Sequence, residues 1–268
     1  MPEFPVAILS DPSTRECLQR LDRGELFSFS YPVIASFDDW LQRDELFLLR
    51  CDGGVLQLVS RQRKVPPLQV DFLQGAMAFR GQQNVRSEML IKAVLGRDKQ
   101  HLPSVTDATA GLGRDSFLLA VLGCEVVMVE RHPIVSALLQ DGLMRYQQQG
   151  DSAISARMQL LTGDFASGAL PEPVAAEVVY LDPMFPTREK SALVKKEMQI
   201  FKQLVGGDPD SDRLMQQALQ RAQRRIVVKR PLKADYLSGM KPTYSLSGRS
   251  SRFDVYQVGS AASTADMV

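Results

Sequence analysis

Apolar positions from about residue 85 onward switch repeatedly between strand and helix spacing. Short apolar runs typical of buried strands stand at 105–109, 125–130, 158–162, 177–182 and 225–229. Between them, apolar residues recur every three or four positions, and this spacing predicts helices over 87–96, 115–122, 133–148, 191–205 and 212–221. Because strands that alternate with helices form parallel sheets covered on both faces, the pattern predicts a doubly wound α/β fold.

The first 80 residues have a weaker pattern, which predicts a small α+β region. Residues 2–9 and 46–51 are typical of strands, and Gly53-Gly54 predicts a hairpin turn into a further strand. Asp11 is a candidate N-cap for a short helix. The expected organisation is an N-terminal α+β region over 1–80, a larger domain over 81–258 and a disordered tail over 259–268.

Composition places the chain among ordinary globular proteins. Of its 268 residues, 44% are hydrophobic and 24% are charged. No apolar stretch approaches the roughly 20 residues that span a bilayer, and the N-terminus lacks the features of a secretory signal. The three cysteines lie far apart, outside any metal-ligand spacing. We therefore expect a cytoplasmic protein with reduced thiols, no disulfide and no metal.

Charge is distributed unevenly, although the net charge is only +1. Residues 101–184 carry 4 basic and 10 acidic side chains, a net charge of −6. Residues 185–256 carry 15 basic and 7 acidic side chains, a net charge of +8. A basic segment of this kind favours a polyanionic partner such as a nucleic acid, with solvated helix faces as the alternative.

The first candidate site is the turn after the strand at 105–109. Asp107 stands near the end of that strand, and Gly111 and Gly113 follow in the turn. Ligands of doubly wound sheets bind outside the carboxyl ends of the strands. Glycine allows a positive φ and a close approach of the backbone to a ligand. The turn is therefore a candidate site for a nucleotide-like cofactor.

Further acidic residues follow the next two strands. Glu130 ends the second strand, where a carboxylate can accept both hydroxyls of a ribose. Asp164 follows the third strand and could accept an adenine amino group, with Phe165 packing near the ring. The third glycine of a nicotinamide-binding turn is missing, because Ser116 stands near its place. S-adenosylmethionine carries no phosphate and has a cationic sulfonium, so it fits a net-acidic segment.

The second candidate site is the tetrapeptide Asp182-Pro-Met-Phe at the end of the fourth strand. The exocyclic amine of a nucleic-acid base is a poor nucleophile, because its lone pair is delocalised into the ring. Asp182 and the carbonyl of Pro183 could accept its two N–H groups, and Phe185 could stack on the base. An ordinary strand-ending turn with Phe185 in the core is the alternative. Access to such a pocket requires a flipped or single-stranded base.

Basic residues near this motif are candidate RNA contacts. Lys195 and Lys196 stand on the helix after the motif, and Lys229 and Arg230 end the fifth strand. All four are expected to contact the RNA backbone, with a solvated helix face as the alternative for the lysine pair.

Several segments together resemble one family, the bacterial small-subunit ribosomal RNA guanine-N2 methyltransferases called RsmJ. They lie between about residues 70 and 256, and include 75–78, 107–115, 129–131, 138–143, 179–186, 190–198, 227–231 and 252–256. The resemblance implies a class I S-adenosylmethionine-dependent methyltransferase fold and methylation of a guanine N2 in 16S ribosomal RNA. It also implies cofactor contacts at Arg114, Asp115, Glu130, Arg131, Asp164, Phe165 and Asp182.

Three other functions remain open on the sequence. An N6-adenine methyltransferase of DNA or RNA would need the same amine geometry. A nicotinamide-dependent oxidoreductase would share the fold, and a non-catalytic RNA-binding module could retain it. The expected partner is 16S ribosomal RNA, with a small-subunit particle as the expected context. The sequence leaves open whether free RNA, a partial particle or the full subunit is the substrate, which guanine is modified, and the oligomeric state.

Overall fold

The computed structural model describes residues 5–23, 31–62, 65–74, 84–168, 170, 174–184, 201, 203–205 and 210–258. The chain forms two compact units, each built from separate segments. One unit contains Met1–Leu73, His132–Gly150 and Met184–Gly207, and the other contains Gln74–Arg131, Asp151–Pro183 and Asp208–Val268. Within the described ranges, no helix has the length and apolar character needed to cross a membrane.

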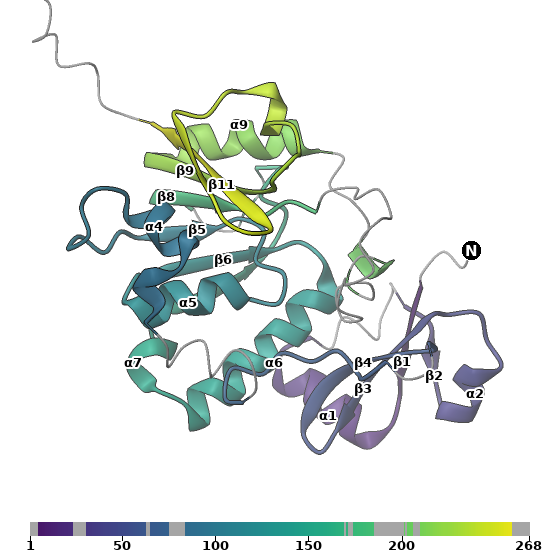
Figure 1. Cartoon of the computed structure of the whole chain (residues 1–268). Coiled ribbons are helices and arrows are strands. Elements are labelled where there is room, and N and C mark those ends of the chain that lie inside the picture. Colours follow the sequence, from purple (N-terminus) through teal and green to yellow (C-terminus); the bar gives the residue numbers. More distant parts are fainter. Residues whose placement is uncertain are drawn as a thin grey trace, which may run out of the picture. The chain divides into compact units, whose positions relative to one another are not determined.

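The second unit is built on a seven-stranded sheet (Figure 1). Its strands, in spatial order, are β10 (Tyr244–Ser247), β11 (Ser251–Gln257), β9 (Ala222–Pro231), β8 (Ala176–Leu181), β5 (Val105–Asp107), β6 (Val126–Glu130) and β7 (Met158–Thr162). The five strands from β9 to β7 pair in parallel, as the sequence predicts. β11 pairs antiparallel with both β9 and β10, and this hairpin at one end of the sheet was not predicted.

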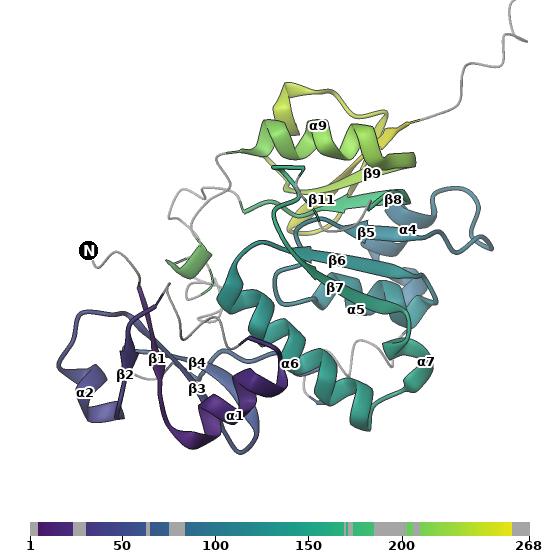
Figure 2. The same ribbon diagram turned by 180° about the vertical axis from the view of Figure 1, so that it is seen from behind.

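Helices cover both faces of this sheet (Figure 2). They are α4 (Met89–Leu95), α5 (Arg114–Leu122), the short α7 (Ser152–Ser155) and α9 (Ser211–Arg221), with 3-10 turns η2 (Val85–Ser87) and η3 (Leu237–Gly239). Neighbouring residues of a strand point to opposite faces. Val179 and Leu181 of β8 lie in one core cluster with Leu214 and Met215 of α9. Tyr180, between them, reaches α5 on the other face.

The helices of this unit begin and end close to the predicted positions. α5 begins one residue before the expected 115–122, and α9 begins one residue before the expected 212–221. α4 ends at the C-cap Gly96, whose φ of 65° is the left-handed conformation that glycine tolerates. The helix expected over 191–205 falls in the first unit, where residues 201 and 203–205 are helical and the other residues lie outside the described ranges.

The first unit contains a four-stranded sheet in the order β2 (Val33–Ile34), β1 (Val6–Leu9), β3 (Phe47–Asp52) and β4 (Val55–Ser60). Its helices are α1 (Pro12–Arg20), α2 (Phe37–Leu41) and α6 (Pro133–Gln149). The predicted hairpin is confirmed, because Asp52 pairs with Val55 across Gly53 and Gly54. The predicted cap is also confirmed, since the Asp11 carboxylate accepts the N–H of Thr14 at 2.7 Å.

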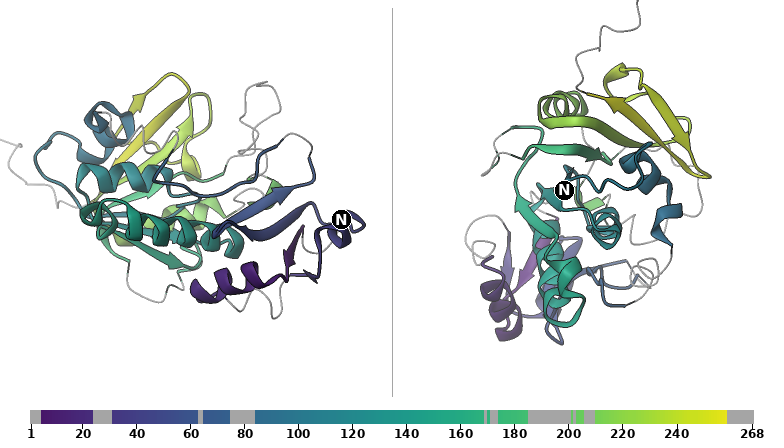
Figure 3. Two further views of the ribbon diagram at one scale, coloured as in Figure 1. Left: turned by 90° about the horizontal axis from the view of Figure 1, so that it is seen from below. Right: turned by 90° about the vertical axis from the view of Figure 1, so that its left-hand side faces the viewer.

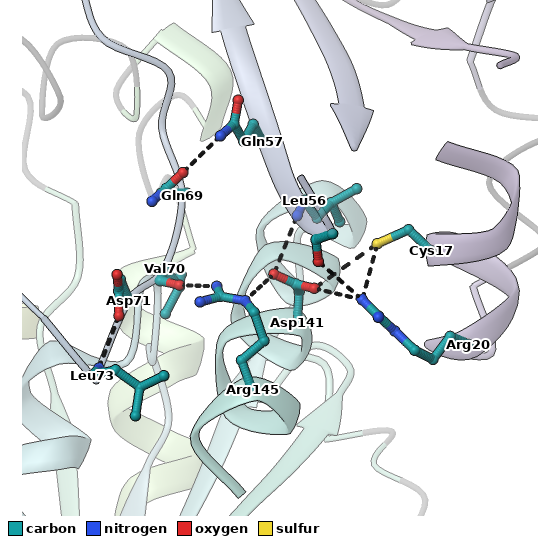
Figure 4. A network of polar contacts seen from close by, with 11 residues as sticks. Cys17, Arg20, Leu56, Gln57, Gln69, Val70, Asp71, Leu73, Asp141 and Arg145 are labelled. Atoms are coloured by element: carbon teal, nitrogen blue, oxygen red, sulfur yellow. Dashed lines mark hydrogen bonds and ion pairs between the residues drawn. The ribbon is translucent and has the colours of Figure 1, made fainter. Parts of the chain in front are cut away.

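A buried carboxylate on α6, Asp141, joins three elements of the first unit (Figure 4). Its Oδ2 accepts the N–H of Leu56 on β4 at 3.2 Å and Nε of Arg145 at 2.9 Å. Its Oδ1 accepts Nη2 of Arg20 on α1 at 3.3 Å. Arg145 also donates to the carbonyl of Val70. Because Asp141 is fully buried, these donors replace the water that its charge would otherwise need.

Candidate active site

The glycine turn connects β5 to α5 in the second unit, where the sequence predicts it. Gly111 has φ 54° and Gly113 has φ 70°, so both adopt the left-handed conformation that side chains disfavour. Gly113 is the N-cap residue of α5, and its carbonyl accepts the N–H of Phe117. The chain can therefore turn from β5 into α5, because neither residue at a positive φ carries a side chain.

Asp107 lies beneath this turn and is 1% exposed. Its Oδ2 accepts Oγ–H of Ser116 at 2.5 Å, and its Oδ1 accepts the N–H of Thr109 at 3.2 Å. Burial raises the pKa of Asp107 to about 7, although the Ser116 hydrogen bond acts in the opposite direction. Asp107 thus fixes the shape of the turn from inside the protein.

Glu130 ends β6 and is bonded to the same turn. Its Oε2 accepts the N–H of Gly111 at 2.9 Å, and its own carbonyl accepts the N–H of Gly163. The next residue, Arg131, donates to both carboxylate oxygens of Asp210, at 2.9 and 3.1 Å. Glu130 therefore joins the glycine turn after β5 to the segment that follows β7.

Asp164 and Phe165 follow β7 and have different surroundings. The Asp164 carboxylate accepts the N–H of Ala166 at 3.0 Å, which forms a local turn. Phe165 is 1% exposed and belongs to the core beside α9, with the Arg221 guanidinium 5.4 Å from its ring centroid. The described contacts place Phe165 in the protein core.

Asp182 lies directly after β8, and contacts from the glycine turn and from β9 fix it. Its backbone N–H donates to Oγ1 of Thr109, in the glycine turn, at 2.7 Å. Its Oδ2 accepts Nζ of Lys229 on β9 at 2.9 Å. The same ammonium lies 2.8 Å from Oδ2 of Asp115 on α5, which also accepts the Tyr180 hydroxyl at 2.7 Å. The two motifs found in the sequence therefore meet at one edge of the sheet.

Lys229 balances the negative charge of this cluster. Burial lowers the pKa of Lys229, but the carboxylates of Asp182 and Asp115 outweigh burial and hold the pKa well above its ordinary value. Burial also raises the pKa of Tyr180, and Asp115 adds to that effect. Lys229 is therefore a cation and Tyr180 a neutral donor at neutral pH, and both stabilise Asp115 as an anion.

The remaining predicted site residues are placed as follows. Arg114 is the first residue of α5, and Pro183 is buried directly after Asp182. Phe185, Lys195 and Lys196 lie outside the described residues. Arg230, expected to contact RNA, is 2% exposed and donates from Nε and Nη2 to the carbonyl of Asp235. Lys229, with the same expectation, instead contacts the two carboxylates.

Thr109 and Tyr180 belong to the site, and sequence reasoning did not select them. Thr109 is the third residue of the glycine motif, and Tyr180 stands two positions before Asp182. A period of two along β8 puts Tyr180 and Asp182 on the same face of the strand, and this signal was available. Among the described residues, no group of three His, Cys, Asp or Glu side chains could hold a metal ion.

The strand order defines the class of protein. When strands are counted from β5, their spatial order is 3-2-1-4-5-7-6 with the seventh strand reversed. This order, with a glycine turn after the first strand and an acidic residue ending the second, is typical of class I methyltransferases. A family model described as SAM-dependent methyltransferase matches residues 35–258. A solved SAM-dependent methyltransferase from Neisseria gonorrhoeae is 32% identical with a TM-score of 0.66, over 94% of this chain and 95% of that one.

Curated relatives identify the family within this class. The ribosomal RNA small subunit methyltransferase J of Hahella chejuensis is 48% identical over 244 residues, which is 89% of this chain and 92% of that protein. Its namesake from Stutzerimonas stutzeri is 46% identical, over 88% of this chain and 95% of that protein. The chain belongs to the ribosomal RNA small subunit methyltransferase J family, and its methyl donor is S-adenosylmethionine.

Proposed function

We propose that this protein transfers a methyl group from S-adenosylmethionine to the exocyclic N2 of one guanine in 16S ribosomal RNA. The relatives' names support the small-subunit ribosomal RNA as substrate. The observation that carries the proposal is the fixed position of Asp182 beside the glycine turn. We infer further that the ribosomal RNA is methylated within a small-subunit particle and that the protein acts in the cytoplasm.

The residues of the site fit the methyl donor. The backbone at Gly111 and Gly113 would lie against the cofactor, with Glu130 at its ribose and Asp164 at its adenine. The proposed cofactor-binding set also contains Asp107, Arg114, Asp115, Arg131, Phe165 and Asp182. The cofactor supplies an electrophilic methyl group on a positively charged sulfur. Carboxylates around the turn stabilise that positive charge, whereas a pyrophosphate would be repelled by them.

Asp182 is proposed to accept one N–H of the guanine amine, and the carbonyl of Pro183 the other. Two acceptors hold the nitrogen lone pair toward the methyl group and favour the pyramidal nitrogen of the transition state. Phe185 is proposed to stack on the base, a contact worth about 1–3 kcal/mol. The N–H becomes acidic as the new N–C bond forms, so Asp182 need not remove a proton beforehand.

Lys229 and Thr109 set the orientation of Asp182. Lys229 contacts Oδ2 of the carboxylate, and Thr109 holds the backbone N–H of the same residue. With the side chain and the main chain both fixed, the carboxylate loses little conformational entropy when the base arrives. The Asp182 side chain is 41% exposed, so a substrate can reach its carboxylate.

A transfer assay tests the proposed function. Small-subunit particles from cells lacking the protein are incubated with labelled S-adenosylmethionine, and the RNA is digested to nucleosides. We expect label in N2-methylguanosine of the 16S RNA. Label in N6-methyladenosine would replace the proposal with the adenine alternative. No incorporation into particles or free RNA by a protein that binds the cofactor would contradict ribosomal RNA as the substrate.

A further inference from the structure

We propose that the sheet edge formed by the carboxyl ends of the parallel strands, where Asp182 lies, binds the phosphate backbone of the substrate RNA through Lys233 and Arg249. Lys233 stands two residues after the end of β9, and Arg249 stands in the turn between β10 and β11. The inference rests on the proposed function, and it identifies the surface that holds the same substrate.

Strand register places both residues at the edge that carries Asp182. Leu181, the last residue of β8, pairs with Val228 of β9. Asp182 follows Leu181, and Lys229 follows Val228, so both lie near the carboxyl ends of their strands. Pro231 ends β9 and pairs with Ser251, the first residue of the antiparallel β11. The turn over 248–250 therefore lies at this edge, at the end of the hairpin drawn in yellow in Figure 3.

The two residues are exposed and positively charged. Lys233, Arg249 and the neighbouring Ser250 are all exposed to solvent. Residues 231–252 carry three exposed cations, Lys233, Lys241 and Arg249, against a single acidic residue, Asp235. The fourth basic residue, Arg252, is paired with the buried Asp254 at 2.9 Å. This excess of positive charge complements RNA, whose phosphates supply most of the affinity in sequence-independent contacts. Residues 101–184, which contain the proposed methyl-donor site, are net acidic, so RNA phosphates are favoured at the positively charged segments after β9 and between β10 and β11.

Hydrogen bonds to the backbone hold the segment after β9 in place. Arg230 donates to the carbonyl of Asp235 at 3.0 and 2.6 Å, and Arg252 donates to the carbonyl of Leu232 at 2.8 Å. The N–H of Ala234 also donates to the carbonyl of Pro231 at 3.1 Å. A segment ordered before binding costs less entropy when it meets RNA. The buried Arg230 thus supports an RNA-binding segment and does not itself contact RNA.

The opposite edge of the same sheet offers a matched control. Arg97 and Lys99 are exposed and stand one and three residues after Gly96, against which the Arg225 guanidinium packs. Arg225 pairs with Gln257 and Val178, near the amino ends of the parallel strands. Replacing Arg97 and Lys99 by alanine removes the same two charges as replacing Lys233 and Arg249, but at the far edge.

The test compares K233A/R249A with R97A/K99A on small-subunit particles. We expect K233A/R249A to raise KM for the particle at least tenfold, with unchanged affinity for S-adenosylmethionine and a kcat within threefold of wild type. The dependence of log KM on log salt should become shallower by about 0.7 for each RNA phosphate that the protein no longer neutralises. R97A/K99A should match wild type. K233R/R249K should stay close to wild type, because this variant keeps both cations.

Equal KM values and salt slopes for K233A/R249A and R97A/K99A would overturn this inference while leaving the proposed function intact. Absence of transfer to ribosomal RNA by the wild-type protein would instead contradict the proposed function. The wild-type assay therefore separates the two failures.

Discussion

Lys229 Nζ lies 2.9 Å from Oδ2 of Asp182 and joins that carboxylate to Asp115, 2.8 Å from the same ammonium. One cation thus connects the residue proposed to hold the substrate amine with the first turn of α5, beside the glycine turn. The arrangement makes the orientation of Asp182 depend on a residue of a neighbouring strand.

Removing the ammonium of Lys229 should impair catalysis more than cofactor binding. In K229M two carboxylates face each other without a cation, so we expect kcat to fall at least tenfold, which corresponds to about 1.4 kcal/mol. The acid limb of the kcat–pH profile should move to higher pH, because repulsion between the carboxylates favours a bound proton. K229R keeps the charge and should retain more activity than K229M.

The Lys229 pKa also has a consequence for stability. Folding raises the pKa of Lys229, so protonated Lys229 adds to the free energy of unfolding. This contribution is fully present below the ordinary pKa of about 10.5 and is lost as the pH rises through the folded-state pKa. At neutral pH the contribution is constant. A change in wild-type stability attributable to Lys229 between pH 6 and pH 9 would contradict the assigned charge state, and K229M provides the comparison.

Thr109 should act on catalysis through the backbone of Asp182. T109V removes the acceptor of the Asp182 N–H while preserving the shape of the side chain. An N–H left without its acceptor costs about 1–3 kcal/mol, so kcat should fall roughly tenfold. T109S keeps the hydroxyl and should stay near wild type. Identical kcat values for T109V and T109S would show that the hydrogen bond does not position Asp182.

Asp107 should make folding stability depend on pH below neutrality. Its pKa rises from 3.8 to about 7 on folding, so its favourable contribution is present below about pH 4 and is lost as pH rises to about 7. At roughly 1.4 kcal/mol per pKa unit, this amounts to about 4 kcal/mol. D107N keeps an acceptor for Thr109 and should flatten the dependence. Urea unfolding at pH 5 and pH 8 gives the free energy of unfolding of wild type and D107N. An equal change between the two pH values in both proteins would contradict the assignment.

Asp141 should be essential for the stability of the first unit. D141A leaves the Leu56 N–H and the largely buried Arg145 without this carboxylate, and breaking a buried ion pair costs about 3–5 kcal/mol. R20Q is a suitable control, because the Arg20 side chain is 41% exposed and such pairs contribute about 0–1 kcal/mol. In urea unfolding, the free energy of unfolding of D141A should be lower than that of R20Q by at least about 2 kcal/mol. A smaller difference would show that the network contributes little.

Local constraints explain which parts of the fold the sequence predicted. The parallel strands were found because their apolar runs are continuous, and the glycine turn because Gly111 and Gly113 are needed at positive φ. The hairpin of β10 and β11 was not predicted, because apolar and polar residues alternate within Tyr244–Ser247 and the strand has no long apolar run. The predicted division at residue 80 remains a proposal, and the observed first unit also contains α6.

Two residues of the candidate site could be predicted from their positions at the ends of strands. Asp182 and Glu130 were selected because each ends a strand at the ligand-binding edge. The surroundings of Lys229 could not be predicted in the same way. A lysine near a strand end has the same local sequence whether it meets solvent or two carboxylates, and only the pairing of β8 with β9 brings Asp182 to it.

The most direct test of the central claim measures N2-methylguanosine in 16S ribosomal RNA from cells that lack this protein and carry either the wild-type or the Asp182→Asn gene. D182N keeps the size of the side chain and removes its charge. We predict that the wild-type gene restores the nucleoside and that D182N does not, while purified D182N still folds and binds S-adenosylmethionine. Full restoration by D182N, or no difference between cells with and without the wild-type gene, would contradict the account.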